Sequence, residues 1–219
     1  MERGGGLIQA PVSLHSLEGG GGESRDNAPP PPPPPGCRLY RRALRRAHCI
    51  LQEPALTARA LAAGENIRAG QSDGRRKQVD MDARDEAARD VYAVLQQEGE
   101  LAGRRPKEWR ALHSQPGCKR QKLHWDFNPN EVRNLRELGL TVPCSVIAAL
   151  QDGTQLLVWD HERGVEVPVV MFAGDVLVFD GDVVHAGAQY SVGSTRVHVY
   201  LDVPELTRDP NFTWPFFRK

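Results

Sequence analysis

Short apolar runs separated by turn residues make up most of the chain between residues 145 and 203. The runs are rich in Val, Ile and Leu, and polar or glycine-containing segments such as Asp152-Gly153 lie between them. Runs of this length predict β-strands, and strands at turn-sized spacing are typical of a barrel or a sandwich. The pattern therefore predicts a mainly β fold, with strands over 119–127, 145–150, 155–159, 165–171, 175–179 and 195–203.

The strand expected over 195–203 carries two kinds of side chain. Positions 197, 199 and 201 are apolar, whereas Arg196, His198 and Tyr200 occupy the alternate positions. Residues two apart lie on the same face of a strand. Because polar groups are costly to bury without partners, the polar face is expected to line a site. For His198, an outward and solvated orientation stays open.

Residues 37–112 have a helical pattern instead. An apolar stripe beside five arginines predicts a basic amphipathic helix over 38–51, with the stripe formed by Leu39, Ala43, Ala47 and Ile50. Its arginines are expected to face water while the stripe packs on the barrel, although contact with nucleic acid or an anionic membrane stays open.

Two further helices are expected before residue 112. Pro54 is expected to end the first helix, and 55–69 to form a second. A third begins at a capping Asp80 or Asp82 and runs to about Leu101, with a buried side formed by Ala87, Val91, Val94 and Leu95. We expect this region to support the β domain rather than to fold separately.

The first 36 residues hold a glycine run and seven consecutive prolines, Pro29 to Pro35. This composition buries too little apolar surface to order itself, so a disordered tail is expected. The polyproline stretch is expected to act as a spacer, with an SH3- or WW-type ligand as the weaker alternative. The expected organisation is a tail over 1–36, a helical support region over 37–112 and a β core over 113–219.

Composition describes an ordinary globular chain: 219 residues, 40% hydrophobic and zero formal net charge. That balance gives no bulk signal for nucleic acid. There is no apolar run near 18 residues and no secretory signal, and the N-terminus is too acidic for a good transit peptide. We expect a cytoplasmic or nuclear protein, with organellar targeting left open. The four cysteines form no CxxC pair and are expected to be reduced.

Two histidines and a carboxylate suggest a metal site. His124 and Asp126 stand two apart in KLHWDF, so a strand would direct both to one face, and His185 ends the run VVH. Two imidazoles and one carboxylate occupy one face of an octahedral metal and leave three positions open. Open positions suit Fe(II) that binds O2 and a bidentate co-substrate, whereas a structural zinc site fills its fourth position with another Cys or His.

Arg196, eleven residues after His185, adds an anion-binding group. A guanidinium is always charged and matches a carboxylate in two parallel hydrogen bonds. It is suited to hold the far end of a dicarboxylate whose 2-oxoacid end chelates the metal, as in 2-oxoglutarate. Weaker candidates for lining the pocket are Tyr190 and Lys122.

The order His-x-Asp, distal His, then Arg about ten residues later resembles the Fe(II)/2-oxoglutarate-dependent dioxygenases, in their phytanoyl-CoA-hydroxylase-like and prolyl-hydroxylase-like branches. The resemblance covers about the last half of the chain. It implies a double-stranded β-helix, a jelly-roll barrel of cupin type, buttressed by the N-terminal helices. It also implies iron bound by His124, Asp126 and His185, and the distal carboxylate of 2-oxoglutarate bound by Arg196.

By the same resemblance the chain would hydroxylate a C–H bond of an unidentified substrate with O2, releasing succinate and CO2, with ascorbate as an optional addition. Two alternatives stay open. One is a non-oxidative metal enzyme of cupin type, which has no use for 2-oxoglutarate. The other is a non-catalytic binding or scaffold protein that uses the proline tail and the basic helix. A peptide side chain, a lipid-like acid, a small metabolite and a methylated base all fit the chemistry.

Overall fold

The computed structural model describes residues 32–67, 73–210 and 212–217, and the described residues from Pro33 onward form one compact unit. Residues 1–31, with the first three prolines of the run, lie outside the described residues. The expectations of a disordered tail and of an SH3 or WW ligand therefore stay predictions. In the described ranges, no helix is long and apolar enough to cross a membrane.

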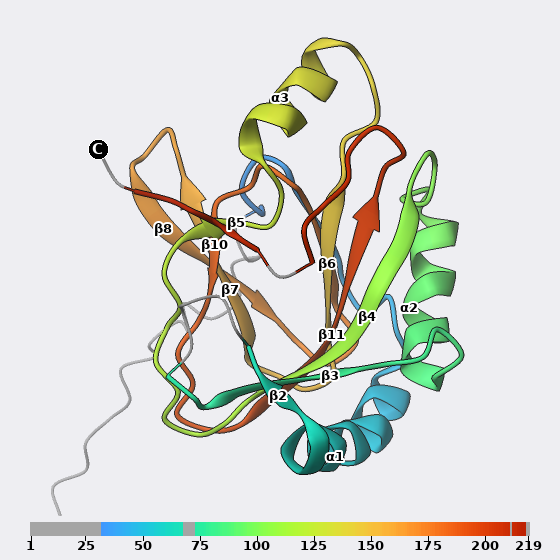
Figure 1. Ribbon diagram of the computed structural model, residues 1–219. Coiled ribbons are helices and arrows are strands. Elements are labelled where there is room, and N and C mark those ends of the chain that lie inside the picture. The colour runs from blue at the N-terminus through green and yellow to red at the C-terminus, as the bar shows by residue number, and fades with distance from the viewer. Residues whose placement is uncertain (1–31, 68–72, 211, 218–219) are drawn as a thin grey trace, which may run out of the picture. The chain divides into compact units, whose positions relative to one another are not determined.

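Two antiparallel sheets make up most of this unit (Figure 1), so the predicted mainly β fold is confirmed. The larger sheet consists of β1 (Cys37–Tyr40), β9 (Val176–Asp180), β6 (Cys144–Ala149), β11 (Ser194–Asp202), β4 (Arg105–Ser114), β3 (Arg76–Asp80) and β2 (Glu65–Asn66), in that spatial order. The smaller consists of β12 (Trp214–Pro215), β5 (His124–Trp125), β10 (His185–Gly187), β7 (Thr154–Asp160) and β8 (Val165–Met171), again in spatial order.

The helices of the described residues are α1 (Arg46–Ala63), α2 (Glu86–Gln97) and α3 (Pro129–Glu137). Figure 1 shows α1 and α2 beside the larger sheet, on the side away from β7 and β8. Their buried side chains join one apolar cluster with residues of that sheet, among them Leu56 of α1 and Val91 of α2. The two helices therefore cover one face of the larger sheet. Helix α3 packs separately, through Val132 and Leu135, against Phe127 and Tyr200.

The central strands direct alternate residues to two different environments. In β6, Val146 and Ala148 join the cluster beneath the helices, while Ile147 and Ala149 pack against residues of β7 and β8. Strand β9 does the same, since Val178 faces the helices and Leu177 faces the smaller sheet. The two-residue period of a strand explains the division. A second apolar core thus lies between the two sheets.

The prediction for the basic helix is wrong in its first part. Residues Cys37–Tyr40 form β1 at the edge of the larger sheet, paired with β9, and α1 begins only at Arg46. Pro54 does not end the helix but lies inside α1, so the segment expected as a second helix continues the first. Proline removes one helical hydrogen bond. The buried Cys49, Leu56 and Ala60 anchor α1 on both sides of Pro54, and this packing outweighs the local preference.

The expected third helix corresponds to α2, whose buried residues include all four that the pattern indicated. The expected start is wrong, because α2 begins at Glu86 after Asp85, and Asp80 belongs to β3. However, residues 37–112 are not mainly helical, because β1, β2, β3 and most of β4 belong to this stretch and to the larger sheet. The expected division at 112 and 113 falls inside β4. In β4 the buried Trp109 and Ala111 alternate with half-buried polar and apolar residues, and the charged neighbours obscured this two-residue period in the sequence.

The core between the sheets gives a first test. Leu177 is fully buried there, so Leu177→Ala should lower the free energy of unfolding by about 2–5 kcal/mol, through lost apolar burial and the cavity left behind. Urea denaturation of the purified protein measures the change. The matched control is Val192→Ala on an exposed side chain, expected to change stability by less than about 0.5 kcal/mol. Equal effects of both variants would contradict the assignment of this core.

Candidate metal centre

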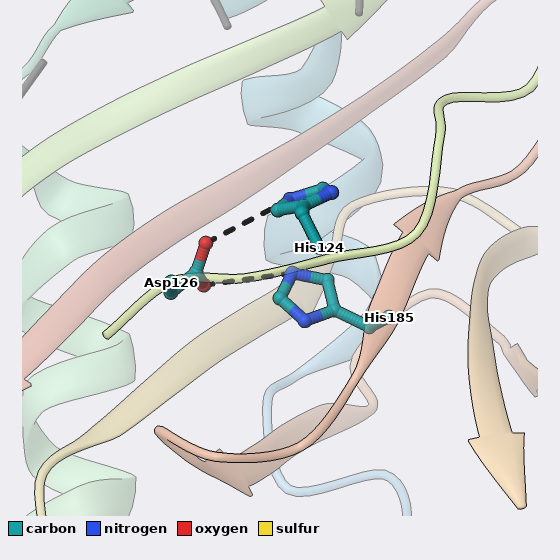
Figure 2. Close-up of side chains that lie close together, drawn as sticks. All are labelled: His124, Asp126 and His185. Carbon is teal, nitrogen blue, oxygen red and sulfur yellow. Dashed lines mark ion pairs between the residues drawn. The ribbon is translucent and has the colours of Figure 1, made fainter. Parts of the chain in front are cut away.

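Two histidines face each other across paired strands of the smaller sheet. His124 of β5 and His185 of β10 are register partners in an antiparallel pair, and their ring centroids lie 4.5 Å apart. Figure 2 shows both rings directed toward Asp126. Residues directly opposite on one face of a sheet have their Cβ atoms close together. Residues 61 positions apart in the sequence thus meet because β5 pairs with β10.

Both imidazoles are held in the same tautomer. The Nδ1 of His124 lies 2.9 Å from the carbonyl oxygen of Lys122, and the Nδ1 of His185 lies 3.0 Å from that of Val183. A carbonyl oxygen only accepts, so each Nδ1 carries the proton and donates it. In a neutral imidazole this leaves the lone pair on Nε2, the atom that both rings direct at Asp126. A backbone partner on one ring nitrogen is the usual way in which a metal-binding histidine is oriented.

Asp126 completes the cluster from the residue just after β5. Its Oδ1 lies 3.8 Å from Nε2 of His124, and its Oδ2 lies 3.5 Å from Nε2 of His185. The ligand atoms of the three residues all lie within 4.8 Å of one another, and all three side chains are buried. Ser145 of β6 donates a 2.6 Å hydrogen bond to Oδ2 and so orients the carboxylate. Trp125 points the other way and packs on Phe216.

Burial and neighbouring charge prepare these groups for a cation. Burial, followed by the proximity of His185, lowers the pKa of His124 to about 4. Burial alone would raise the pKa of Asp126, but His185, His124, His198 and the Ser145 hydroxyl together lower it to about 2. At neutral pH His124 is therefore a neutral ligand and Asp126 an ionised one. Neutral imidazole and carboxylate are the donor set that suits a divalent iron with open positions.

A cavity of about 90 Å³ adjoins the cluster, between the two sheets. Its wall includes Arg196, His198 and Tyr200 of β11, all on one face of the strand, while Val197, Val199 and Leu201 lie beneath the helices. Burial lowers the pKa of His198 to about 3, so this imidazole is neutral at physiological pH. Other polar residues on the wall are Gln78, Arg110, Gln121 and Gln155. The cavity combines three potential metal ligands with one buried guanidinium.

Arg196 is 4% exposed and donates from Nη1 to the hydroxyl oxygen of Ser114, at 3.1 Å. Within the part of the chain that the structure describes, no carboxylate lies within ion-pair distance of it. A buried guanidinium without a carboxylate is costly unless a ligand supplies the negative charge. Arg196 therefore marks the end of the cavity suited to an anion.

The two weaker candidates lie elsewhere. The Lys122 side chain is exposed, and Tyr190 packs with Cys118 and Ala188 while its hydroxyl bonds the backbone of Gln155. A continuous strand over 119–127 would place Lys122 on the same face as His124, but only His124 and Trp125 of that predicted strand form β5. Lys122 therefore lies outside the strand geometry that directs His124 into the cluster.

A larger cleft of about 450 Å³ opens beside the cavity and shares part of its wall. The shared residues are Ile67, Gln78, Arg110, Tyr200 and Thr213. Arg208 places its guanidinium carbon 3.6 Å from the centroid of the Tyr200 ring, which holds that ring at the junction. The cleft therefore offers a route from the surface to the cluster.

Sequence reasoning missed several residues that shape this centre. Ser145 supports Asp126, and Ser114 supports Arg196. A second buried arginine, Arg76 of β3, also bonds Ser114. Ser145 had a detectable signal, since it is the one polar residue of the otherwise apolar run 145–150. Arg76 had none, because it stands in the charged stretch GRRK, which resembles a loop.

No protein-family model and no curated protein matches this sequence. Solved structures do match it in fold. A Pseudomonas putida prolyl-4-hydroxylase is 17% identical with a TM-score of 0.55, over 77% of this chain and 92% of that one. HygX from Streptomyces hygroscopicus, solved with nickel and 2-oxoglutarate bound, is 11% identical with a TM-score of 0.56, over 79% and 85% of the two chains.

A third similar structure is SnoK, a non-heme alpha-ketoglutarate-dependent carbocyclase from nogalamycin biosynthesis. It is 17% identical with a TM-score of 0.58, over 76% of this chain and 79% of that one. At such identities the likeness shows the fold and leaves the reaction open. The chain therefore shares the fold of iron- and 2-oxoglutarate-dependent oxygenases, and the roles of its residues have to be argued from their geometry.

The Ser145 hydroxyl provides a test of the centre. Ser145→Ala should weaken Fe(II) binding about 10- to 100-fold, because Asp126 loses the hydrogen bond that orients it. Anaerobic titration with Fe(II), followed by calorimetry, measures the affinity. The matched control is Ser194→Ala on β11, a buried serine whose hydroxyl lies near Thr154 and away from the three ligands. Unchanged affinity in Ser145→Ala would contradict the role given to Ser145.

The buried histidines predict a pH dependence for the metal-free protein. His124 and His198 have folded-state pKa values of about 4 and about 3, below the ordinary value of 6.5. Between pH 6.5 and pH 4 the unfolded chain binds more protons than the folded one, so the free energy of unfolding should fall as the pH falls through this window. Urea denaturation with chelator present measures it. His198→Gln should reduce the slope, and a flat profile would contradict the buried, neutral state.

Proposed function

We propose that this chain is an Fe(II)- and 2-oxoglutarate-dependent dioxygenase that hydroxylates a C–H bond. One observation carries the proposal. A buried two-histidine, one-carboxylate cluster and a buried arginine without a carboxylate partner among the described residues line the same cavity. The first feature suits a divalent metal with open coordination positions, and the second suits an anion. The co-substrate that satisfies both ends is a 2-oxoacid with a distal carboxylate.

In this proposal His124, Asp126 and His185 hold the iron through Nε2, a carboxylate oxygen and Nε2. These three side chains fit a divalent iron, because each imidazole donates its Nδ1 proton to a backbone carbonyl and the carboxylate is ionised at neutral pH. Bound iron would supply the oxidation in which O2 and 2-oxoglutarate are consumed and a hydroxylated product, succinate and CO2 are released.

The protein's own share of the reaction is positioning and the exclusion of water. Arg196 binds the distal carboxylate and thereby sets the distance of the 2-oxoacid end from the three ligands. Three residues of the inter-sheet core, Ile147, Leu156 and Phe179, add apolar surface to the cavity wall and limit water there. His198, neutral and buried, adds a polar group near Asp126 without adding charge.

Arg196 distinguishes this proposal from a non-oxidative enzyme of cupin type. Such an enzyme has no need for a guanidinium that is buried at one end of the metal cavity. The fold shared with HygX, which was solved with nickel and 2-oxoglutarate bound, supports the same choice. The similar structures include both a prolyl-4-hydroxylase and a carbocyclase, so the fold is compatible with more than one substrate class. We propose that the substrate enters through the cleft at Tyr200.

Anaerobic titration tests the proposal. Addition of Fe(II) and then 2-oxoglutarate to the purified protein should produce a metal-to-ligand charge-transfer band in the visible spectrum. Asp126→Ala should abolish both the binding of Fe(II) and the charge-transfer band. Arg196→Leu should retain iron and weaken 2-oxoglutarate binding by about 100-fold, because the charge-assisted pair is lost.

The alternative outcomes separate the competing functions. Bound metal without a band in the wild-type protein would favour the non-oxidative enzyme. A protein that binds no metal would favour the scaffold. An Arg196→Leu variant with unchanged 2-oxoglutarate affinity would contradict the anion-binding role of Arg196.

A further inference from the structure

We propose that Arg76 is a positioning residue of the 2-oxoglutarate site, one that holds Arg196 and the strand carrying His185 in a fixed relation. The inference rests on the proposed function and extends it to a residue outside the metal cluster. Arg76 opens β3 and is fully buried, with a relative exposure of 0%. It belongs to GRRK, a charged stretch that resembles a loop in the sequence.

The Ser114 hydroxyl joins the two arginines. Arg76 lies opposite Ser114 in the register of β3 and β4, and its Nη1 donates to Oγ at 2.8 Å. Arg196 donates to the same oxygen at 3.1 Å. One hydroxyl oxygen thus accepts from both guanidinium groups. The hydrogen bond from Arg76 fixes the Ser114 hydroxyl so that its oxygen also accepts from Arg196. The other N–H groups of Arg196 remain available to a ligand.

The other end of the Arg76 guanidinium holds the strand of the second histidine. Its Nη2 donates to the carbonyl oxygen of Lys119 at 2.8 Å, and to those of Gly187 and Ala188. Gly187 and Ala188 follow His185 by two and three residues. A Cβ at Gly187 would lie 2.4 Å from the Gln121 side chain and 3.0 Å from Arg76, so the strand approaches this pair closely. Arg76 therefore contacts the metal-ligand strand and the anion site together.

Charge makes this arrangement costly without a ligand. Within ion-pair distance of Arg76 the described residues include no carboxylate, and its Nε is buried without a hydrogen-bond partner. Burial, and then the charge of Arg196, lower the pKa of Arg76. Two buried guanidinium groups repel each other, and three carbonyl contacts do not neutralise a charge. A carboxylate bound at Arg196 would relieve this repulsion, so Arg76 strengthens the site for anions specifically.

A purely structural role for Arg76 predicts a different effect on ligand affinity from a positioning role. Two ligands distinguish these two roles. The first probe is 2-oxoglutarate. The second is 2-oxopentanoate, which keeps the metal-chelating 2-oxoacid and has a methyl group in place of the distal carboxylate. Affinities for both come from the charge-transfer band of the Fe(II) protein. A structural defect weakens both ligands and Fe(II) alike, whereas a defect in the anion site weakens 2-oxoglutarate alone.

Arg76→Met should lower the affinity for 2-oxoglutarate about 10- to 100-fold, the range for hydrogen bonds to a charged group. The affinities for 2-oxopentanoate and Fe(II) should change by less than about 3-fold. Arg76→Lys keeps the charge without the planar fork and should give an intermediate loss. The matched control is Arg75→Met, the exposed neighbour that also bonds a carbonyl, and it should change nothing.

Ser114→Ala provides a second route if Arg76→Met fails to fold. It removes the shared hydroxyl and should cause the same selective loss, and Arg76→Lys should add little to it. Equal weakening of both ligands and Fe(II), or no weakening, would overturn the inference while leaving the proposed function intact. A wild-type protein that gives no band with 2-oxoglutarate would overturn the proposed function and this inference with it.

Discussion

The two-residue period of the central strands is the constraint on which the rest of the structure depends. In β6, β9 and β11 one set of alternate residues packs beneath α1 and α2, and the other set faces the smaller sheet. That division places Ser145, Arg196 and His198 inside the molecule although they lie on strands anchored by valines and alanines. A register shift of one residue would exchange the two faces and remove the site. By packing on the apolar face of these strands, α1 and α2 indirectly fix the position of the polar residues on the opposite face.

Charge is distributed unequally within the centre. Asp126 is surrounded by two imidazoles and a hydroxyl, so its negative charge is supported on several sides. Arg76 and Arg196 share a single hydroxyl oxygen, and no carboxylate of the described chain is within ion-pair distance of either. One end of the cavity thus suits a cation held by preformed ligands, and the other suits an anion. A metal-chelating dianion fits this polarity better than a neutral molecule does.

The candidate metal centre and the outer cleft draw on partly different segments of the chain. The three candidate ligands come from the pairing of β5 with β10, deep between the sheets. The outer cleft is lined by residues of α1, β2 and β3, by Arg110 and Tyr200, and by Pro210, Phe212 and Thr213. Solved structures with this fold include a prolyl-4-hydroxylase and a carbocyclase, so the fold is compatible with more than one reaction. Tyr200 is one of the five residues that the walls of the cavity and the cleft share.

Local pattern alone indicated the mainly β fold, the buried face of α2, the alternation of β11 and the three residues that form the cluster. These features depend on periodicity and residue type, which a sequence displays directly. The local pattern did not reveal that residues 37–40 and 76–80 form strands, that Pro54 lies within α1, or that Lys122 is exposed. Those outcomes depend on partners distant in the sequence: β9 pairs with β1, and the sheet beneath α1 outweighs the preference of proline. Arg76 shows the limit most clearly, because burial of a charge inside GRRK becomes tolerable only when Ser114, Lys119, Gly187 and Ala188 supply acceptors from three other segments of the folded chain.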